Sequence, residues 1–329
     1  MTTNKCVSRD KLLKKLKTWF VKNKGKTKIT IVISRKECAS NATANVKLND
    51  NNNVISIPKS LLIVADDVYH LPIWNTNIRY SNINNKSKLA IAVLWHKNKG
   101  TKSFFNHYIN ILPKNLKHIP IFWTKKVKNL VENTYFGLLL QNRKIELDNE
   151  YNDVKKCLNG KLKITKKEFM WARHIVGSRN FGIMINGISK NILAPFGDML
   201  NHSDTNNVSW SFNDNSNAFE FKSNRIILKN EIINITYGKT KMDYYVLLYY
   251  GFFPQRNRQI IFDGYVLSNI KQNLPKSVKK KIKKHLDSFP TTLEQDIKTY
   301  KTMNTSKESN LIVATKVLIN EKEILNLHI

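Results

Sequence analysis

The sequence predicts an α+β fold, because segments with helical periodicity and segments with strand alternation occupy separate parts of the chain. A lysine-rich stretch at residues 9–24 has apolar side chains three and four positions apart, which is typical of an amphipathic helix. Residues 28–34 and 54–57 are short and rich in β-branched side chains, as strands are. Between residues 88 and 167 the pattern is mostly helical.

The individual elements follow from these periodicities and from the residues that end them. Strands are expected at residues 28–34 and 54–57, followed by 61–64, and later at 230–238. Helices are expected at residues 9–24, 89–95, 104–112, 127–140, 169–179, 278–286 and 292–303. Prolines mark breaks between these elements, at Pro58, Pro113, Pro120 and Pro290.

The chain is strongly basic, with 55 Lys and Arg residues against 24 Asp and Glu residues and a formal net charge of +31. The lysines are spread along the chain and accompany asparagine-rich runs such as residues 49–53, which indicates a compositional bias toward Lys, Asn and Ile. Positive charge attracts polyanions and acidic surfaces. We therefore expect non-specific polyanion binding or attraction to acidic protein substrates, with specific nucleic-acid binding as the less favoured alternative.

Length and hydropathy indicate an intracellular protein. A chain of 329 residues with 41% hydrophobic side chains can bury one large core or two modest ones. It begins with a charged segment, and its apolar runs fall short of the roughly 18 residues needed to cross a bilayer. We expect a monomer in the cytoplasm or nucleus, without membrane contact.

Cysteine and histidine spacing predicts neither a disulfide framework nor a metal site. The three cysteines are scattered, at Cys6, Cys38 and Cys157. Three histidines recur every eleven residues, at His96, His107 and His118, but they lack cysteine or carboxylate partners at ligand spacing. We therefore expect these histidines to be exposed or to lie at helix ends.

The most specific run is residues 193–202, where an apolar segment meets Pro195 and Gly197 and then presents Asp198, Asn201 and His202. Proline and glycine disfavour helix and let the backbone turn. Three side chains able to donate and accept hydrogen bonds then arrive together. This arrangement predicts a pocket wall.

Further motifs lie on either side of this run. Upstream is Ser178-Arg179-x-Phe181, and downstream a strand-like segment ends on Tyr237-Gly238, followed by Tyr250-Gly251-Phe252. In this order and with these gaps, the set resembles the SET-domain methyltransferases over residues 11–254. It is most similar to the branch of the Rubisco large-subunit lysine methyltransferase and the actin-histidine methyltransferase.

The resemblance implies SET-domain β-sheets with a helical insertion and a helical C-terminal lobe. Four segments are then expected: an N-terminal helix with the first part of the SET domain, the insertion, the C-terminal part of the SET domain with the motifs, and a reduced C-terminal lobe. Their bounds are residues 1–87, 88–168, 169–254 and 255–329. The implied cofactor is S-adenosyl-L-methionine, and the implied partner is a protein substrate.

The resemblance also assigns cofactor contacts. Arg179 would approach the carboxylate of S-adenosylmethionine, which suits the planar fork of a guanidinium. Asn201 and His202 would hold the adenine, with Asp198 orienting the loop from behind. Residues 39–44 stand where the family has a glycine-rich turn, and there Asn41 and Ala42 would touch the amino-acid end of the cofactor.

Tyr237 is the implied catalytic residue, because its hydroxyl group can align an amine with the methyl group. Trp210 and Tyr250 would form walls of the substrate channel, since aromatic faces attract an ammonium group. Phe181 and Gly197 would face the target side chain and offer no hydrogen bond, so lysine is preferred over histidine.

Two alternatives stay open. One is a protein-histidine methyltransferase on the same scaffold. The other is a catalytically degenerate SET protein that acts as a binding module, because the glycine-rich turn is altered.

Overall fold

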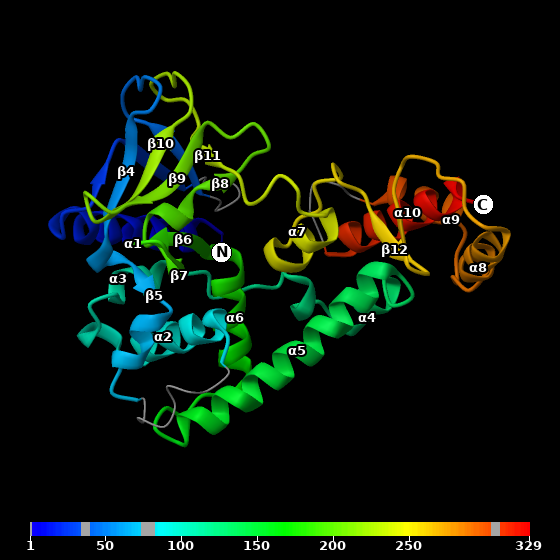
Figure 1. Cartoon of the computed structure of the whole chain (residues 1–329), viewed down its shortest axis with the longest axis horizontal. Coiled ribbons are helices and arrows are strands. Elements are labelled where there is room, and N and C mark those ends of the chain that lie inside the picture. Colours follow the sequence, from blue (N-terminus) through cyan, green and yellow to red (C-terminus); the bar gives the residue numbers. More distant parts are fainter. Residues whose placement is uncertain (1, 34–39, 74–82, 304–309) are drawn as a thin grey trace. The chain divides into compact units, whose positions relative to one another are not determined.

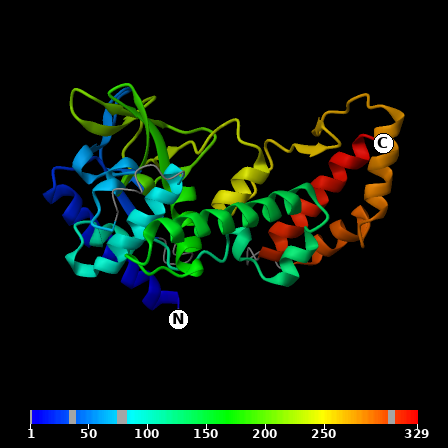
Figure 2. The ribbon, with the colours of Figure 1, turned by 60° about the horizontal axis from the view of Figure 1, so that its bottom comes forward.

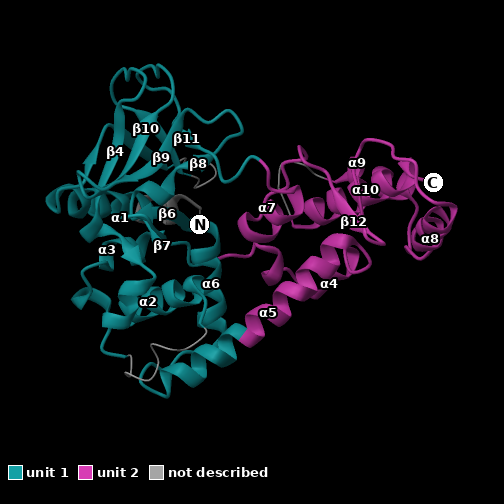
Figure 3. Cartoon of the chain, in the orientation of Figure 1, with its two compact units in different colours: residues 1–114, 150–239 teal, residues 115–149, 240–329 magenta. Residues whose placement is uncertain are grey.

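The structure is a computed structural model of the chain, and it describes residues 2–33, 40–73, 83–303 and 310–329, with the backbone alone for residues 2–8. Cys38 and Ala39 lie outside the described residues. The chain forms two compact units, residues 1–114 with 150–239 and residues 115–149 with 240–329 (Figure 3). Each unit is therefore assembled from two stretches that are distant in sequence, and the expected insertion contributes to both.

Among its described residues, the first unit holds four small sheets (Figure 1). Its strands are β1 (Lys26–Thr27), β2 (Ile29–Ile33), β3 (Ser40–Ala44), β4 (Asn53–Pro58), β5 (Ile63–Val64), β6 (Asn180–Ile185), β7 (Ile188–Leu193), β8 (Asn201–His202), β9 (Val208–Asn213), β10 (Ala218–Ser223) and β11 (Asn234–Ile235). The strand orders are β1-β4-β10-β9, β5-β7-β6, β2-β3 and β8-β11. The β8-β11 pair is parallel and the other pairs are antiparallel.

The first unit also contains helices, several of which contact these sheets. They are α1 (Thr2–Lys22), α2 (Asn85–Lys99), α3 (Asn106–Ile111) and α6 (Lys166–Arg179), with 3-10 turns η1 (Lys59–Leu61), η2 (Asp66–His70), η4 (Gly100–Lys102) and η6 (Gly197–Met199). The apolar stripe of α1 is buried at Leu13, Leu16, Trp19 and Phe20, as its periodicity predicts. Phe20 stacks on Phe196 with ring centroids 4.7 Å apart, which anchors α1 beside the loop at residues 193–202.

The second unit is mainly helical. It contains η5 (Pro120–Phe122), α4 (Lys125–Leu130), most of α5 (Tyr135–Leu158), α7 (Asp243–Tyr250), β12 (Ile260–Phe262), β13 (Tyr265–Leu267), α8 (Lys276–Asp287), α9 (Leu293–Thr302) and α10 (Asn310–Leu327). Helix α10 lies against α8 and α9 (Figure 2). Gly251 ends α7 in a left-handed conformation, and a Cβ there would come within 2.6 Å of the His118 ring, so this turn requires glycine.

Two predicted elements are shorter than their patterns suggest. The expected strand at 230–238 is reduced to Asn234–Ile235, because Asn230 turns with a φ of +66° and the carboxylate of Glu231 accepts the backbone N–H of Leu228. The expected helix at 127–140 is two helices. The Thr134 hydroxyl accepts the N–H of Gly137 and so caps the start of α5.

Candidate active site

Three stretches that are far apart in the sequence meet in the first unit. Strand β8 pairs with β11 in register, with Asn201 opposite Asn234. The segment just before β11 is hydrogen-bonded to β3. The N–H of Ile233 donates to the carbonyl of Ala42 at 2.8 Å, and the N–H of Ala44 donates to the carbonyl of Glu231 at 3.0 Å. The backbone segments near residues 41, 201 and 235 therefore lie next to one another in the first unit.

Asn201 and Asn41 contact each other there. The side-chain amide of Asn201 donates to the carbonyl of Ser40 at 2.7 Å and to Oδ1 of Asn41 at 3.0 Å. Both N–H groups of the side-chain amide are thus engaged. The side-chain oxygen, Oδ1, is therefore the amide atom with which Asn201 can bind a ligand. Asn41 is exposed, whereas Ala42 is 2% exposed and its carbonyl is bonded to Ile233.

His202 and Tyr237 form a second pair. Their rings stack with centroids 5.2 Å apart, and the N–H of Tyr237 donates to Nδ1 of His202 at 3.1 Å. Because Nδ1 accepts, the proton of a neutral imidazole belongs on Nε2, which lies 3.2 Å from Oδ1 of Asp204. The imidazole is therefore fixed on both edges.

The hydroxyl group of Tyr237 donates to the carbonyl of Leu200 at 2.8 Å. This bond fixes the half-buried ring at the end of β11. Since the hydroxyl proton is used in this bond, the oxygen could act toward a ligand only as an acceptor.

Arg179 approaches the same loop from the end of α6, a helix whose start is fixed by a capping box of Thr165 and Glu168. Its Nη1 donates to the carbonyl of Asp198 at 2.9 Å and lies 3.5 Å from Oδ1 of that residue. The Arg179 side chain is 19% exposed, and its buried Nε has no hydrogen-bond partner among the described residues.

Asp198 lies behind the loop with its side chain fully buried. Besides Arg179 it contacts Tyr108 of α3, whose hydroxyl donates to Oδ2 of Asp198 at 2.5 Å. Burial raises the pKa of Asp198, against the positive charge of Arg179 and the hydrogen bond from Tyr108. Burial and the neighbouring carboxylate raise the pKa of Tyr108 well above its usual range, so its hydroxyl stays a donor.

The loop itself is held in an uncommon conformation. Phe196 has a φ of +76°, a region that bulky side chains rarely adopt. A Cβ on the next residue, Gly197, would come within 2.6 Å of the Phe221 ring and 2.8 Å of Ile57. Close packing on this side therefore requires glycine before Asp198.

Two of the three predicted channel residues are neighbours. The rings of Phe181 and Trp210 meet edge to face with centroids 5.2 Å apart, and both contact Phe219. Phe181 is 8% exposed and Trp210 is half-buried. The third, Tyr250, belongs to the second unit, where burial raises its pKa to about 12, and its place in the channel stays a prediction.

Sequence reasoning missed Asn207. Its side chain is 2% exposed, donates to the carbonyl of Ile232 at 2.8 Å and accepts the N–H of Asn234 at 3.0 Å. It thereby holds the segment that leads into Tyr237. In a chain so rich in asparagine, no local signal distinguishes this residue from its neighbours.

The described residues contain neither a candidate metal site nor a candidate membrane span. No group of three or more His, Cys, Asp or Glu side chains there could hold a metal ion. None of the described helices combines the length and the apolar character that a membrane span requires.

Comparisons with known proteins agree with this architecture. The family model described as Rubisco LSMT substrate-binding matches residues 272–325, which include most of α8 to α10. SET domain-containing protein 4 of Artemia parthenogenetica is 27% identical over 219 residues, covering 62% of this chain and 53% of that protein. SET domain-containing protein 8 of Schizosaccharomyces pombe is 27% identical over 177 residues, covering 52% of this chain and 39% of that protein.

Solved structures resemble the chain over nearly its whole length. The crystal structure of the SET domain of LSMT bound to lysine and AdoHcy has a TM-score of 0.80 at 16% identity, covering 96% of this chain and 90% of that one. Rubisco LSMT bound to AdoMet has a TM-score of 0.78 at 17% identity, with the same coverage. The chain spans about half or less of the two curated relatives. It has the α+β SET fold of these LSMT structures, which confirms the fold expected from the sequence.

Proposed function

We propose that this chain transfers a methyl group from S-adenosylmethionine to the side-chain amine of a lysine in a protein. The observation that carries the proposal is the position of Tyr237. Its ring is stacked on His202 and its hydroxyl is fixed on Leu200, one residue before the contact between Asn201 and Asn41. The SET fold of the chain and its similarity to LSMT structures bound to AdoMet and to lysine support the assignment.

The described residues fit the cofactor. Arg179 offers a partly exposed guanidinium, which suits a carboxylate. The carbonyl oxygen of Asn201 would accept from the adenine amino group, next to the fixed ring of His202. The exposed Asn41 would touch the amino-acid end, with the small Ala42 beside it. Bound there, S-adenosylmethionine supplies a methyl group on a positively charged sulfur.

Tyr237 would align the reaction. A neutral lysine amine donates its lone pair to the methyl carbon, the carbon–sulfur bond breaks with its electron pair going to sulfur, and the methylated amine releases a proton to water. The Tyr237 oxygen, whose proton is directed at Leu200, accepts an N–H of the amine and sets the direction of its lone pair. The residue therefore contributes orientation rather than charge.

Lysine is the favoured target because the proposed channel offers aromatic faces and few hydrogen bonds. Phe181 and Trp210 lie edge to face, and Gly197 packs on Phe221. Aromatic faces suit an ammonium group, and a water-poor channel lowers the pKa of a lysine. A histidine target would require a group that fixes which nitrogen attacks.

The protein partner would be held by the C-terminal helices. Residues 272–325 match the family described as Rubisco LSMT substrate-binding, which supports a role for α8 to α10 in gripping a protein substrate. With a formal net charge of +31, the chain favours an acidic partner.

The proposal is tested by isothermal titration with S-adenosylmethionine, followed by transfer of a labelled methyl group to a cell extract. Asn201→Ala should weaken cofactor binding, whereas Tyr237→Phe should leave binding nearly unchanged and lower transfer about 100-fold. Label in acid-stable methyl-lysine supports the lysine assignment, and label in methyl-histidine supports the alternative. A folded protein that does not bind the cofactor would leave the binding-module alternative.

A further inference from the structure

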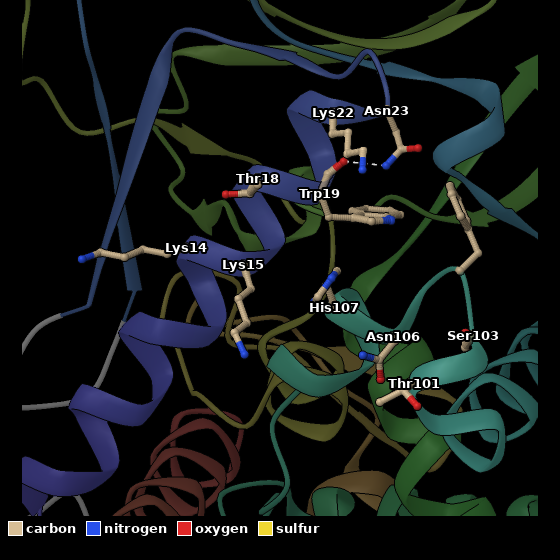
Figure 4. A pocket seen from close by; sticks show the side chains of 11 residues that line it. Lys14, Lys15, Thr18, Trp19, Lys22, Asn23, Thr101, Ser103, Asn106 and His107 are labelled. Atoms are coloured by element: carbon tan, nitrogen blue, oxygen red, sulfur yellow. Dashed lines mark hydrogen bonds between the residues drawn. The ribbon is translucent and has the colours of Figure 1, made fainter.

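A cavity of about 590 Å³ lies in the first unit, and its described lining residues include none of those assigned above to the cofactor or substrate (Figure 4). It is bordered on one side by α1, from Lys14 to Asn23, and on the other by residues 101–107, which lead into α3. Helices α1 and α3 contact each other, so the cavity is walled by two packed elements.

The cavity is basic. Lys15, Thr18 and Lys22 follow each other at spacings of three and four on α1, so they share the face that borders the cavity. Lys15 and His107 lie around the same space (Figure 4). None of the described residues that line it is acidic, so a cationic ligand would find no counter-charge.

An aromatic side chain stands at the same cavity. Phe104 is 48% exposed although it belongs to a compact aromatic cluster. Its ring meets Trp19 edge to face at 5.3 Å and Phe105 at 5.1 Å, so the ring is held in place while one part of it faces solvent. A fixed and partly exposed ring is a surface on which a planar group can stack.

We propose that this cavity binds a nucleotide unit, with the base stacked on Phe104 and the phosphate held by Lys15 and Lys22. Lysines neutralise phosphates, and a base can stack on an adjoining aromatic ring. Proteins bind single-stranded nucleic acids and nucleotides with this combination of basic and aromatic side chains. Thr18 and Asn106 add hydroxyl and amide groups at the same cavity. An acidic peptide would use the lysines but would have no use for the ring.

The lysine contribution is tested by fluorescence anisotropy with a fluorescein-labelled 12-nucleotide oligouridylate. Lys15→Gln combined with Lys22→Gln should raise the Kd about tenfold and reduce its dependence on salt. The matched control is Lys11→Gln combined with Lys17→Gln, two exposed lysines of the same helix that do not line the cavity. The control should change the Kd less than about twofold. Equal losses in both double variants would overturn the proposal, because general charge would then account for binding.

The aromatic contribution needs its own variant. Phe104→Leu keeps an apolar side chain and should raise the Kd for the oligonucleotide about fivefold or more, while competition by inorganic tripolyphosphate should be unchanged. Asn106→Asp places a carboxylate at the cavity and at the N-terminus of α3, where it does not oppose folding, and should also weaken binding. If neither variant changes the Kd for the oligonucleotide, the proposal is overturned.

Competitors identify the source of the nucleotide. Displacement of the label by uridine monophosphate supports a free nucleotide as ligand, and displacement by unlabelled oligouridylate alone supports a single strand. Displacement by polyglutamate as effectively as by oligouridylate would overturn the proposal in favour of an acidic peptide. Asn201→Ala should leave oligonucleotide binding unchanged, because the site is separate from the proposed cofactor site.

Discussion

The hydroxyl group of Tyr108 donates a 2.5 Å hydrogen bond to Asp198, although the two residues are 90 positions apart in the sequence. Asp198 in turn contacts Arg179 through its carbonyl group and its carboxylate. A tyrosine in α3 therefore supports, through one buried carboxylate, the arginine proposed to bind the cofactor.

Tyr108→Phe should destabilise the protein and weaken cofactor binding. The variant leaves Asp198 without one of its partners, and an unpaired buried polar group costs about 1–3 kcal/mol in the free energy of unfolding. Because the carboxylate then holds Arg179 less firmly, we expect the Kd for S-adenosylmethionine to rise about threefold to tenfold. Urea denaturation and isothermal titration measure the two effects.

Tyr244→Phe is the matched control. Tyr244 is equally buried, and its hydroxyl accepts a 2.8 Å hydrogen bond from Asn320, but it belongs to the second unit. This variant should lower stability and leave the Kd for the cofactor unchanged. A Tyr108→Phe protein that binds the cofactor as wild type does would contradict the positioning role.

Local sequence patterns predicted the segments that meet at the candidate active site but not the contacts that support them. The apolar stripe of α1 and the turn signals at Pro195 and Gly197 are local, so they could be recognised without a structure. The bond between Tyr108 and Asp198 depends on the packing of α3, which no local pattern encodes. Asn207 was hidden for a different reason, because asparagine is common throughout the chain.

Helix α10 was not predicted because its burial removes the usual signal. A surface helix has an apolar stripe and a polar face, which produce a period of 3.6 residues. In α10 the buried residues include polar ones that have partners inside the unit. Lys322, for example, is 1% exposed and forms an ion pair with Asp296 at 2.5 Å. The apolar and charged side chains of α10 are therefore not segregated into two faces with the 3.6-residue period of a surface helix.

Asn207→Ala should destabilise the segment that carries Tyr237. The variant loses the bonds to Ile232 and Asn234 and leaves their backbone groups unpaired, at a cost of about 2 kcal/mol in the free energy of unfolding. Methyl transfer should fall as well, since Tyr237 would be less well fixed. Asn224→Ala removes one exposed hydrogen bond, to Asn206, and should cost less than about 0.5 kcal/mol. Similar stability losses in both variants would contradict the assignment.

The buried ion pair between Arg173 and Glu150 should dominate the charge contribution to stability in the first unit. Two of its contacts are 2.6 Å and 3.0 Å, and the hydroxyl of Ser87 donates to the same carboxylate at 2.9 Å. Arg173→Leu removes the buried guanidinium that contacts this carboxylate in two places, which should cost about 3–5 kcal/mol in the free energy of unfolding. Differential scanning calorimetry and urea denaturation measure the change.

Lys97→Ala is the control for this pair. Lys97 and Glu168 join α2 to α6 at 3.4 Å, with side chains 47% and 42% exposed. Solvent screens such a pair, so its loss should cost less than about 1 kcal/mol. If the two variants were equally destabilised, burial would not be what makes the Arg173 contact important.

His96 gives the protein a pH dependence in the acid range. Its side chain is 8% exposed, and its Nδ1 lies 2.9 Å from the hydroxyl of Ser103. Burial and the nearby charge of Lys99 lower the pKa of His96 to about 4. An unfolded histidine has a pKa of about 6.5, so between these values the unfolded state binds more protons. Stability contributed by the neutral ring is therefore present above about pH 6.5 and is lost as the pH falls toward about 4.

His96→Gln should remove this dependence. We expect the free energy of unfolding of the wild type to fall by about 2 kcal/mol more than that of the variant between pH 7 and pH 4.5, after allowance for partial solvent screening. Urea denaturation at four pH values across this range measures the difference. His70→Gln, which replaces an exposed histidine, is the matched control variant. Parallel curves for wild type and His96→Gln would show that the buried ring does not resist protonation, because a neutral glutamine at that position cannot titrate.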